Sequence, residues 1–262
     1  MSTPCVLVLA GLDPSGGAGL LADAEAIRQS GVRPLCVPTA LTAQTTRAAR
    51  SFQPCAPTFM LEMARALLEE EDVRAIKLGM LATPQTARAI GDLLSEHPSI
   101  PVVLDPVLAA SSGALLFKGS PEDARAAVQS LWARAIVTPN LAEAQLLLGL
   151  TAPLHSPGDQ EIAARALLSA GARAAVVKGG HGDGPEAIDV VAFCAAPGPS
   201  GIRVIHLAGP RVPGTARGTG CRFASALAAR LALGRPLDWA ARGAKQAVTA
   251  YLAARIAGTA PG

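Results

Sequence analysis

The stretch CVLVLAGLDPSGGAGLLADAEAI, residues 5–27, contains a strand, a turn and a helix, and this unit predicts the type of fold. Residues 5–10 form a continuous apolar run, which is typical of a strand buried on both faces of a parallel sheet. A glycine-rich turn follows at residues 11–19, and a helical segment then extends to about Ser30. The turn lacks the Gly-Lys-Ser/Thr sequence of a P-loop. No acidic residue follows at the distance that a dinucleotide-binding fingerprint requires.

The same alternation of apolar strands and helices continues along the chain. Strands are expected at 35–41, 75–80, 101–106, 135–138 and 174–178, two more at 190–194 and 202–207, and helices at 57–70, 84–96, 121–132, 159–170 and 237–256. The helix at 57–70 carries Phe59, Met63, Ala66 and Leu67 on one face. The alternation predicts a three-layer α/β/α sandwich, with a mostly parallel central sheet and the last two strands as an antiparallel edge.

The composition of the 262 residues favours one large domain, 1–262, and argues against several classes of function. Half of the residues are hydrophobic and only 16% are charged, which provides a sizeable core. No apolar run approaches the roughly 18 residues of a membrane span, and no signal peptide is seen, so a cytoplasmic location is expected. Aromatic residues are only 3% and the arginines are dispersed, so nucleic-acid binding is not expected. The five cysteines include no CxxC pair.

A second glycine-rich stretch, RGTGC at residues 217–221, leads directly into an alanine-rich helix. The first N–H groups of a helix have no partner within the helix, and the helix dipole adds a partial positive charge there. The pattern therefore predicts an anion-binding site, with an ordinary glycine-rich helix start as the alternative.

Polar and charged residues gather where the predicted strands end. In an open α/β sheet, ligands bind outside the carboxyl ends of the strands. These ends carry Asp13, Gln44, Met80, Asp105, Asn140, Lys178 and the loop at 218–221. A carboxylate, an amide, a lysine and an anion-binding helix start suit phosphoryl transfer, which depends on positioning and charge stabilisation. For each residue alone, a solvated strand end is the alternative.

Seven motifs, in this order along nearly the whole chain, resemble the bacterial hydroxymethylpyrimidine/phosphomethylpyrimidine kinases of thiamine biosynthesis, within the ribokinase-like superfamily. They are GLDPSGGAG at 11–19 with Asp23, ALTAQ at 40–44, KLGML at 77–81, VLDPV at 103–107, VTPNL at 137–141 with Glu143, VKGGH at 177–181 and GTGC at 218–221. The resemblance implies a ribokinase-like fold, the use of ATP and Mg²⁺, a small pyrimidine as substrate and a homodimer.

The resemblance also implies that Gly11, Asp23, Gln44, Met80 and Val107 bind the substrate. The amide of Gln44 fits an aminopyrimidine edge, which has a ring nitrogen beside an amine, whereas a polar helix cap after the second strand is the alternative. Met80 is expected to pack on the flat ring, with core filling as the alternative. Asp23 is expected at a substrate hydroxyl; otherwise it is a charge favoured by the helix dipole.

For the nucleotide, the resemblance implies binding by Asp105, Asn140, Glu143, Lys178 and Thr219. The carboxylates of Asp105 and Glu143 are the candidate ligands of Mg²⁺, because this ion prefers oxygen ligands. Asn140 and Glu143 are three residues apart, so they either face one ligand or form a capping box. Lys178 is expected to offset phosphate charge, and a surface lysine is the alternative.

The candidate catalytic residues are Gly218, Thr219, Gly220, Cys221 and Lys178. A cysteine at a helix N-terminus has a lowered pKa, so Cys221 is expected to form a thiolate near neutral pH. Proton removal is not demanding in a loose transition state, so Cys221 is expected to matter less than the glycine pocket. The alternative is a small buried side chain at the helix start.

Two arginines depart from the family pattern. Arg217 stands where the family usually has histidine or a small polar residue, and Arg222 where it has threonine or serine. They either strengthen phosphate binding, crowd the nucleotide or point into solvent.

Two other functions compete with a pyrimidine kinase. One is a pyridoxal or pyridoxine kinase, because its substrate is also a flat hydroxymethyl compound. The other, suggested by the two arginines, is a pyrimidine-binding protein that has lost turnover.

Overall fold

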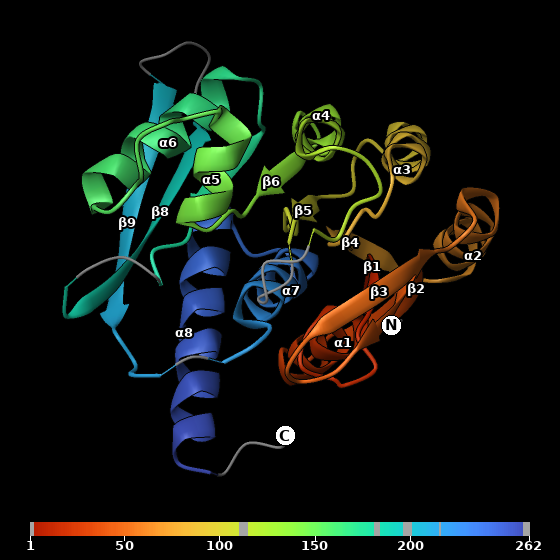
Figure 1. Cartoon of the computed structure of the whole chain (residues 1–262), viewed down its shortest axis with the longest axis horizontal. Coiled ribbons are helices and arrows are strands. Elements are labelled where there is room, and N and C mark those ends of the chain that lie inside the picture. The colour runs from red at the N-terminus through yellow and green to blue at the C-terminus, as the bar shows by residue number, and fades with distance from the viewer. Residues whose placement is uncertain (1–2, 110–114, 181–183, 196–200, 215, 259–262) are drawn as a thin grey trace.

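A mixed sheet with helices on both faces forms the centre of the molecule (Figure 1). The computed structural model describes residues 3–109, 115–180, 184–195, 201–214 and 216–258. Within these residues, the sheet has the strand order β3-β2-β1-β4-β5-β6-β7-β8-β9. The strands are β1 (Cys5–Leu12), β2 (Arg33–Gln44), β3 (Ala49–Pro54), β4 (Val73–Leu78), β5 (Val102–Leu104), β6 (Ala135–Val137), β7 (Ala174–Val177), β8 (Glu186–Cys194) and β9 (Ile202–Pro210).

The pairing confirms the mostly parallel sheet with an antiparallel edge. Strands β2, β1, β4, β5, β6 and β7 pair in parallel. At one end, β8 and β9 pair antiparallel, as predicted. At the other end, β3 pairs antiparallel with β2, which the sequence did not predict.

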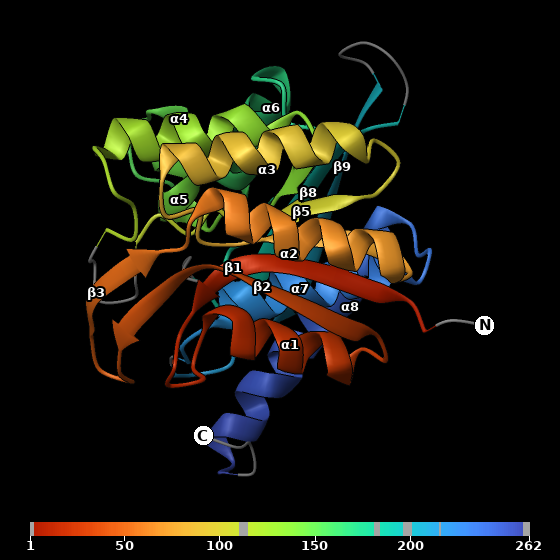
Figure 2. The ribbon, with the colours of Figure 1, turned by 90° about the vertical axis from the view of Figure 1, so that its right-hand side faces the viewer.

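Helices on both faces of the sheet confirm the three-layer sandwich. The helices are α1 (Gly19–Gln29), α2 (Pro57–Glu70), α3 (Pro84–Glu96), α4 (Pro121–Trp132), α5 (Leu141–Leu148), α6 (Pro157–Ser169), α7 (Thr219–Ala232) and α8 (Leu237–Ile256). One apolar core joins the sheet to α2–α6, and a second core joins it to α1, α7 and α8. Figure 2 shows α2, α3 and α4 on one side of the strands, and α1, α7 and α8 on the other.

Strand β1 explains why its sequence is apolar without alternation. Leu7 and Leu9 belong to the core beneath α2–α6, whereas Val6 and Val8 belong to the opposite core. All four side chains have no exposed surface. Because successive side chains of a strand point to opposite faces, a central strand covered on both faces requires apolar residues at every position.

The apolar face named for α2 is only partly correct. Met63 and Leu67 pack against the core, but Phe59 is 57% exposed, and the fully buried residues of the helix are Met60 and Ala64. Gln44 is followed by the turn to β3 rather than by a helix, so it is not a helix cap. His181, the last residue of the VKGGH motif, lies outside the described residues.

The order of the strands creates the crevice in which a ligand is expected. From β1 the chain moves to β2 on one side, and it later returns to β4 on the other side of β1. The carboxyl ends of β1 and β4 therefore flank a topological switch point, where open α/β sheets bind their ligands. Within the part of the chain that the structure describes, no helix has the length and hydropathy of a membrane span.

Candidate active site

A cavity of about 880 Å³ lies at the carboxyl ends of the strands. Its walls include every predicted site residue except Asp23. These residues are Gly11, Gln44, Met80, Asp105, Val107, Asn140, Glu143, Lys178, Gly218, Thr219, Gly220 and Cys221. The fold therefore gathers residues from six strand ends and the start of α7 around one space.

The two glycine-rich turns pack against each other at the start of α7. Gly218 precedes the helix with a φ of +72°, and a Cβ there would lie 2.2 Å from the carbonyl oxygen of Gly17. Glycine is thus required both by its backbone conformation and by the close approach of the first turn. None of the described side chains caps the helix, so its first N–H groups remain available for an anion.

Lys178 and Asp105 form an ion pair beside this helix start. The Lys178 Nζ lies 2.9 Å from Asp105 Oδ1, and a Cβ on Gly220 would lie 3.0 Å from the same Nζ. Burial alone would raise the pKa of Asp105, but Lys178 and Lys77 outweigh it and hold that pKa below its usual value. Asp105 is therefore a carboxylate at neutral pH, and Lys178 faces the helix start as a cation.

Asn140 and Glu143 form the capping box that was the structural alternative for them. Asn140 Oδ1 accepts from the Glu143 N–H at 2.9 Å, and Glu143 Oε2 accepts from the Asn140 N–H at 2.8 Å. Both residues nevertheless line the cavity. Burial and the nearby charge of Asp105 raise the pKa of Glu143 to about 7, against the opposing effect of Lys178.

The carboxylates of Asp105 and Glu143 suit a magnesium ion that also binds a nucleotide. The described residues contain no group of three or more acidic, histidine or cysteine side chains that could enclose a metal by themselves. Mg²⁺ usually keeps several waters and binds one or two carboxylates together with substrate phosphates. Two carboxylates on one cavity wall fit that requirement.

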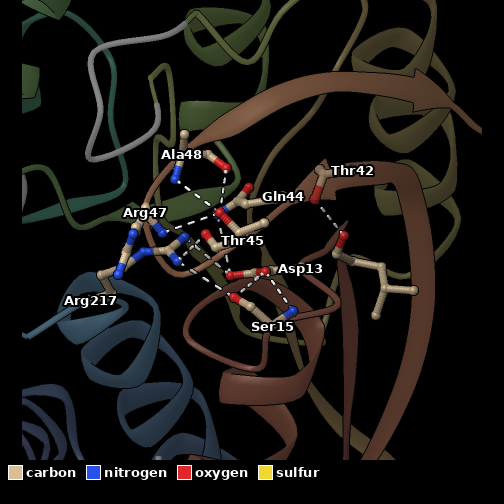
Figure 3. A network of polar contacts seen from close by, with 9 residues as sticks. Asp13, Ser15, Thr42, Gln44, Thr45, Arg47, Ala48 and Arg217 are labelled. Atoms are coloured by element: carbon tan, nitrogen blue, oxygen red, sulfur yellow. Dashed lines mark hydrogen bonds and ion pairs between the residues drawn. The ribbon is translucent and has the colours of Figure 1, made fainter.

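At the other end of the cavity, Gln44 belongs to a polar network with Asp13 (Figure 3). Gln44 Nε2 donates to Asp13 Oδ2 at 3.2 Å, and Asp13 Oδ1 accepts from the backbone and hydroxyl of Ser15. Arg217 reaches the same carboxylate, with its Nη2 3.2 Å from Asp13 Oδ2. Asp13 thus holds the Gln44 amide at the cavity wall.

Met80 and Val107 supply an apolar surface near Gln44. Met80 is only 5% exposed, and Val107 packs against the small cluster that contains it. A Cβ on Gly11 would lie 2.7 Å from Met80 Sδ, so glycine lets the thioether pack directly against this strand. An amide beside a thioether suits a flat ring with polar edges.

Asp23 does not line the cavity, and its contact with a substrate hydroxyl stays a prediction. Asp23 is completely buried, with its Oδ2 2.8 Å from Lys77 Nζ and its Oδ1 accepting from Ser225 Oγ. Lys77 lies in the cavity wall, and its role was not predicted. Burial alone would lower the pKa of Lys77, but Asp23, Cys221 and Asp105 together outweigh it and raise that pKa. The available signal was a lysine that follows the buried residues Ala75 and Ile76 within a strand.

The predicted thiolate at Cys221 is wrong. Burial raises the pKa of the Cys221 thiol to about 12, and the nearby carboxylates add to the effect of burial. A hydrogen bond from the Gly19 N–H and the charge of Lys77 oppose this change without reversing it. The helix start is thus outweighed by loss of solvent, and Cys221 is a neutral thiol at physiological pH.

Arg222 takes none of the positions that were considered for it. Its side chain is buried, pairs with Glu25 at 2.6 Å and lies with its guanidinium carbon 4.0 Å from the centre of the Tyr251 ring. It therefore joins α7 to α1 and α8 and points neither at a phosphate nor into solvent. Arg217, by contrast, lines the cavity.

A third part of the cavity was not predicted at all. Lys245 of α8 pairs with Asp189 of β8 at 3.0 Å, and both line the cavity together with Val248 and Leu252. The residues of α8 are spaced three and four apart, which places them on one face of the helix. That spacing was the available signal, but it does not reveal the partner on β8.

The model of the phosphomethylpyrimidine kinase family matches residues 13–260. The chain belongs to this family. It is 37% identical over 256 residues to the hydroxymethylpyrimidine/phosphomethylpyrimidine kinase of Rhizobium meliloti. The aligned region covers 97% of this chain and 91% of that protein. Kinases of this family are phosphotransferases, and the chain is an enzyme of that class.

The chain is also similar to a longer protein and to a solved structure. The chain is 35% identical over 255 residues to the thiamine biosynthesis multifunctional protein ThiED of Corynebacterium efficiens, covering 95% of this chain and 33% of that protein. It thus spans about a third of that relative's length. The crystal structure of an ADP complex of Bacillus subtilis pyridoxal kinase has a TM-score of 0.81 at 26% identity, covering 94% of this chain and 90% of that one.

Proposed function

We propose that the chain transfers a phosphoryl group from ATP to 4-amino-5-hydroxymethyl-2-methylpyrimidine, and then a second one to the resulting monophosphate, in thiamine biosynthesis. The observation that carries this proposal is that Gln44 and Met80 line the same cavity as the start of α7. A ring held at one end thus directs its hydroxymethyl group toward an anion-binding loop.

The pyrimidine ring contacts Gln44, Met80, Gly11 and Val107. The amide of Gln44 pairs with the ring nitrogen and the exocyclic amine, and Asp13 fixes the orientation of this amide. Met80 and Val107 supply the apolar contact for the ring face. A ligand without the amine leaves a polar group unpaired, at a cost of about 1–3 kcal/mol.

The phosphates of ATP bind between the start of α7 and the residues at the ends of β5, β6 and β7. The N–H groups of Thr219 and Gly220 and the ammonium of Lys178 stabilise negative charge there, which is the main requirement of phosphoryl transfer. Mg²⁺, held by Asp105 and Glu143 with Asn140 beside them, would offset charge on the nucleotide phosphates.

Cys221 lies beside the reacting oxygen as a neutral thiol and does not act as a base. A protonated thiol donates a hydrogen bond, and one to Asp105 contributes to the low pKa of that carboxyl. We therefore assign most of the rate enhancement to the loop of Gly218 to Gly220 and to Lys178, with a smaller contribution from Cys221.

The similarity to a pyridoxal kinase structure favours a second candidate, phosphorylation of pyridoxal. The two substrates are compared by steady-state phosphorylation at matched concentrations, with ATP and Mg²⁺. The proposal predicts a higher kcat/KM for the pyrimidine, because the Gln44 amide matches its aminopyrimidine edge. A higher value for pyridoxal would reject the substrate assignment, and binding without any turnover would indicate a pyrimidine-binding protein.

We further propose that residues 1–262 form one kinase domain, which acts as a cytoplasmic homodimer. The resemblance noted in the sequence supports this proposal, and Trp239 is a large apolar side chain that is 68% exposed on the single chain. Sedimentation velocity at micromolar concentration tests it, and a monomer under those conditions would reject the dimer.

A further inference from the structure

Arg217 links three segments that surround the substrate end of the cavity. Its Nη1 donates to the carbonyl oxygen of Thr45 at 2.7 Å and reaches Ser15 Oγ at 3.4 Å, while its Nη2 pairs with Asp13 (Figure 3). It immediately precedes Gly218, the residue before α7. The guanidinium therefore lies between the residues assigned to the ring and the loop assigned to phosphate.

The donors of Arg217 are only partly used. The side chain is 25% exposed and lines the cavity, and its contacts with Thr45, Ser15 and Asp13 use Nη1 and Nη2. Its Nε–H has no partner among the described residues, and Nη2 carries a second hydrogen. A guanidinium has five N–H donors in a planar fork, which matches the oxygens of a phosphate. Arg217 can thus remain anchored to Thr45 and Asp13 while it donates to an anion in the cavity.

The charges at this end of the cavity distinguish two kinds of acceptor. Asp13 and Arg217 together carry no net charge, which suits a neutral alcohol. An acceptor that already carries a phosphate brings nearly two negative charges and places them beside the carboxylate of Asp13. The start of α7 supplies only a partial positive charge and the cation of Lys178 is paired with Asp105, so the guanidinium of Arg217 adds the full positive charge that offsets this repulsion.

We propose that Arg217 binds the phosphate of a phosphorylated acceptor, and that it determines how well the enzyme uses a phosphate monoester relative to the corresponding neutral alcohol. This inference rests on the proposed function, because it concerns the second of the two phosphorylations. A histidine or a small residue at this position would offer fewer N–H donors to a phosphate.

The test compares both acceptors in the variant Arg217→Gln. We expect kcat/KM for the pyrimidine monophosphate to fall at least tenfold, mainly through a higher KM, while kcat/KM for the hydroxymethylpyrimidine changes less than threefold. Arg217→Lys should restore part of the loss, because it retains the charge without the fork. The matched control is Arg47→Gln, an exposed residue of the neighbouring turn, which should alter neither reaction.

The alcohol reaction also reports whether each variant is folded, since it uses the same cavity. Equal losses for the two acceptors in Arg217→Gln would show that Arg217 only joins the loops, and an unchanged monophosphate reaction would show that it does not contact the acceptor. A wild-type enzyme that phosphorylates neither acceptor would reject the proposed function instead. In that case, calorimetry with the pyrimidine monophosphate still tests Arg217, and equal affinity of wild type and Arg217→Gln would overturn its role.

Discussion

At the scale of single residues, Gln44 carries the recognition of the pyrimidine ring. Its amide is held by Asp13 at the cavity wall, so it is oriented before a ligand arrives. An oriented amide loses little conformational freedom on binding, which strengthens discrimination between rings.

Replacing Gln44 by alanine should raise the KM for the pyrimidine about tenfold or more, and the KM for ATP less than twofold. The reason is that the amine and ring nitrogen lose their partners, whereas the nucleotide end is unchanged. Steady-state kinetics with each substrate varied in turn measures both values. Gln53→Ala, an exposed glutamine on the paired strand β3, is the matched control. Equal changes in the two KM values of Gln44→Ala would contradict the assignment.

The neutral thiol of Cys221 has a kinetic consequence. Because burial raises its pKa to about 12, the enzyme gains no thiolate as the pH rises from 7 to 9. We expect Cys221→Ala to lower kcat moderately and to leave the shape of the pH profile between 7 and 9 unchanged. Parallel pH–rate profiles of wild type and variant check this. A rise in wild-type activity that the variant lacks would show that the thiolate takes part.

At the scale of elements, the start of α7 depends on its contact with the first glycine-rich turn. In Gly218→Ala, the Cβ meets the carbonyl oxygen of Gly17, and the φ of +72° is itself unfavourable. We expect kcat to fall at least a hundredfold, because the helix start moves, and the free energy of unfolding to fall by about 1–3 kcal/mol.

The variant Gly234→Ala distinguishes the effect of backbone strain from the effect of the steric collision. Gly234 has a φ of +75° with no atom near its Cβ position, so its variant carries the backbone strain without the collision. It should lose stability and retain its kcat. If Gly218→Ala behaved like Gly234→Ala in turnover, the packing of the two turns would not position the site.

The buried pair of Asp23 and Lys77 joins α1 to β4 behind the cavity. Asp23→Ala leaves Lys77 as a buried charge without its carboxylate, and we expect the free energy of unfolding to fall by about 3–5 kcal/mol. Urea denaturation measures the change. The double variant Asp23→Leu/Lys77→Met removes both charges and should be less destabilised. A single variant as stable as the double one would show that the ion pair is not required.

At the scale of the whole molecule, the order of strands and helices was predictable, because buried central strands and proline-initiated helices have clear local signals. The predicted bounds of α2, α3, α4 and α8 match those of the structure. Strand β3 was missed because ARSFQP is short, mostly polar and at the sheet edge, so it carries little apolar pattern. The buried face of α2 depends on which strands the helix covers, and this cannot be deduced from the sequence of the helix alone.

Much of the candidate site was predictable in the same way. The predictions failed where residues that are distant in the sequence determine the chemistry. Strand ends converge because parallel strands share one edge, so Gln44 and Lys178 could be placed in one cavity in advance. Asp23 could not, because its partner Lys77 lies 54 residues away and removes it from the cavity. The pKa of Cys221 depends on solvent exclusion by several elements, which a helix-start motif does not reveal.

The most direct test of the central claim is a time course of the products formed from 4-amino-5-hydroxymethyl-2-methylpyrimidine with ATP and Mg²⁺, with the mono- and diphosphate resolved by chromatography. The cavity, with Gln44 at one end and the start of α7 at the other, predicts that the monophosphate appears first and is then converted to the diphosphate. Consumption of ATP with pyridoxal but no pyrimidine phosphate, or no phosphorylated product with either compound, would contradict the account.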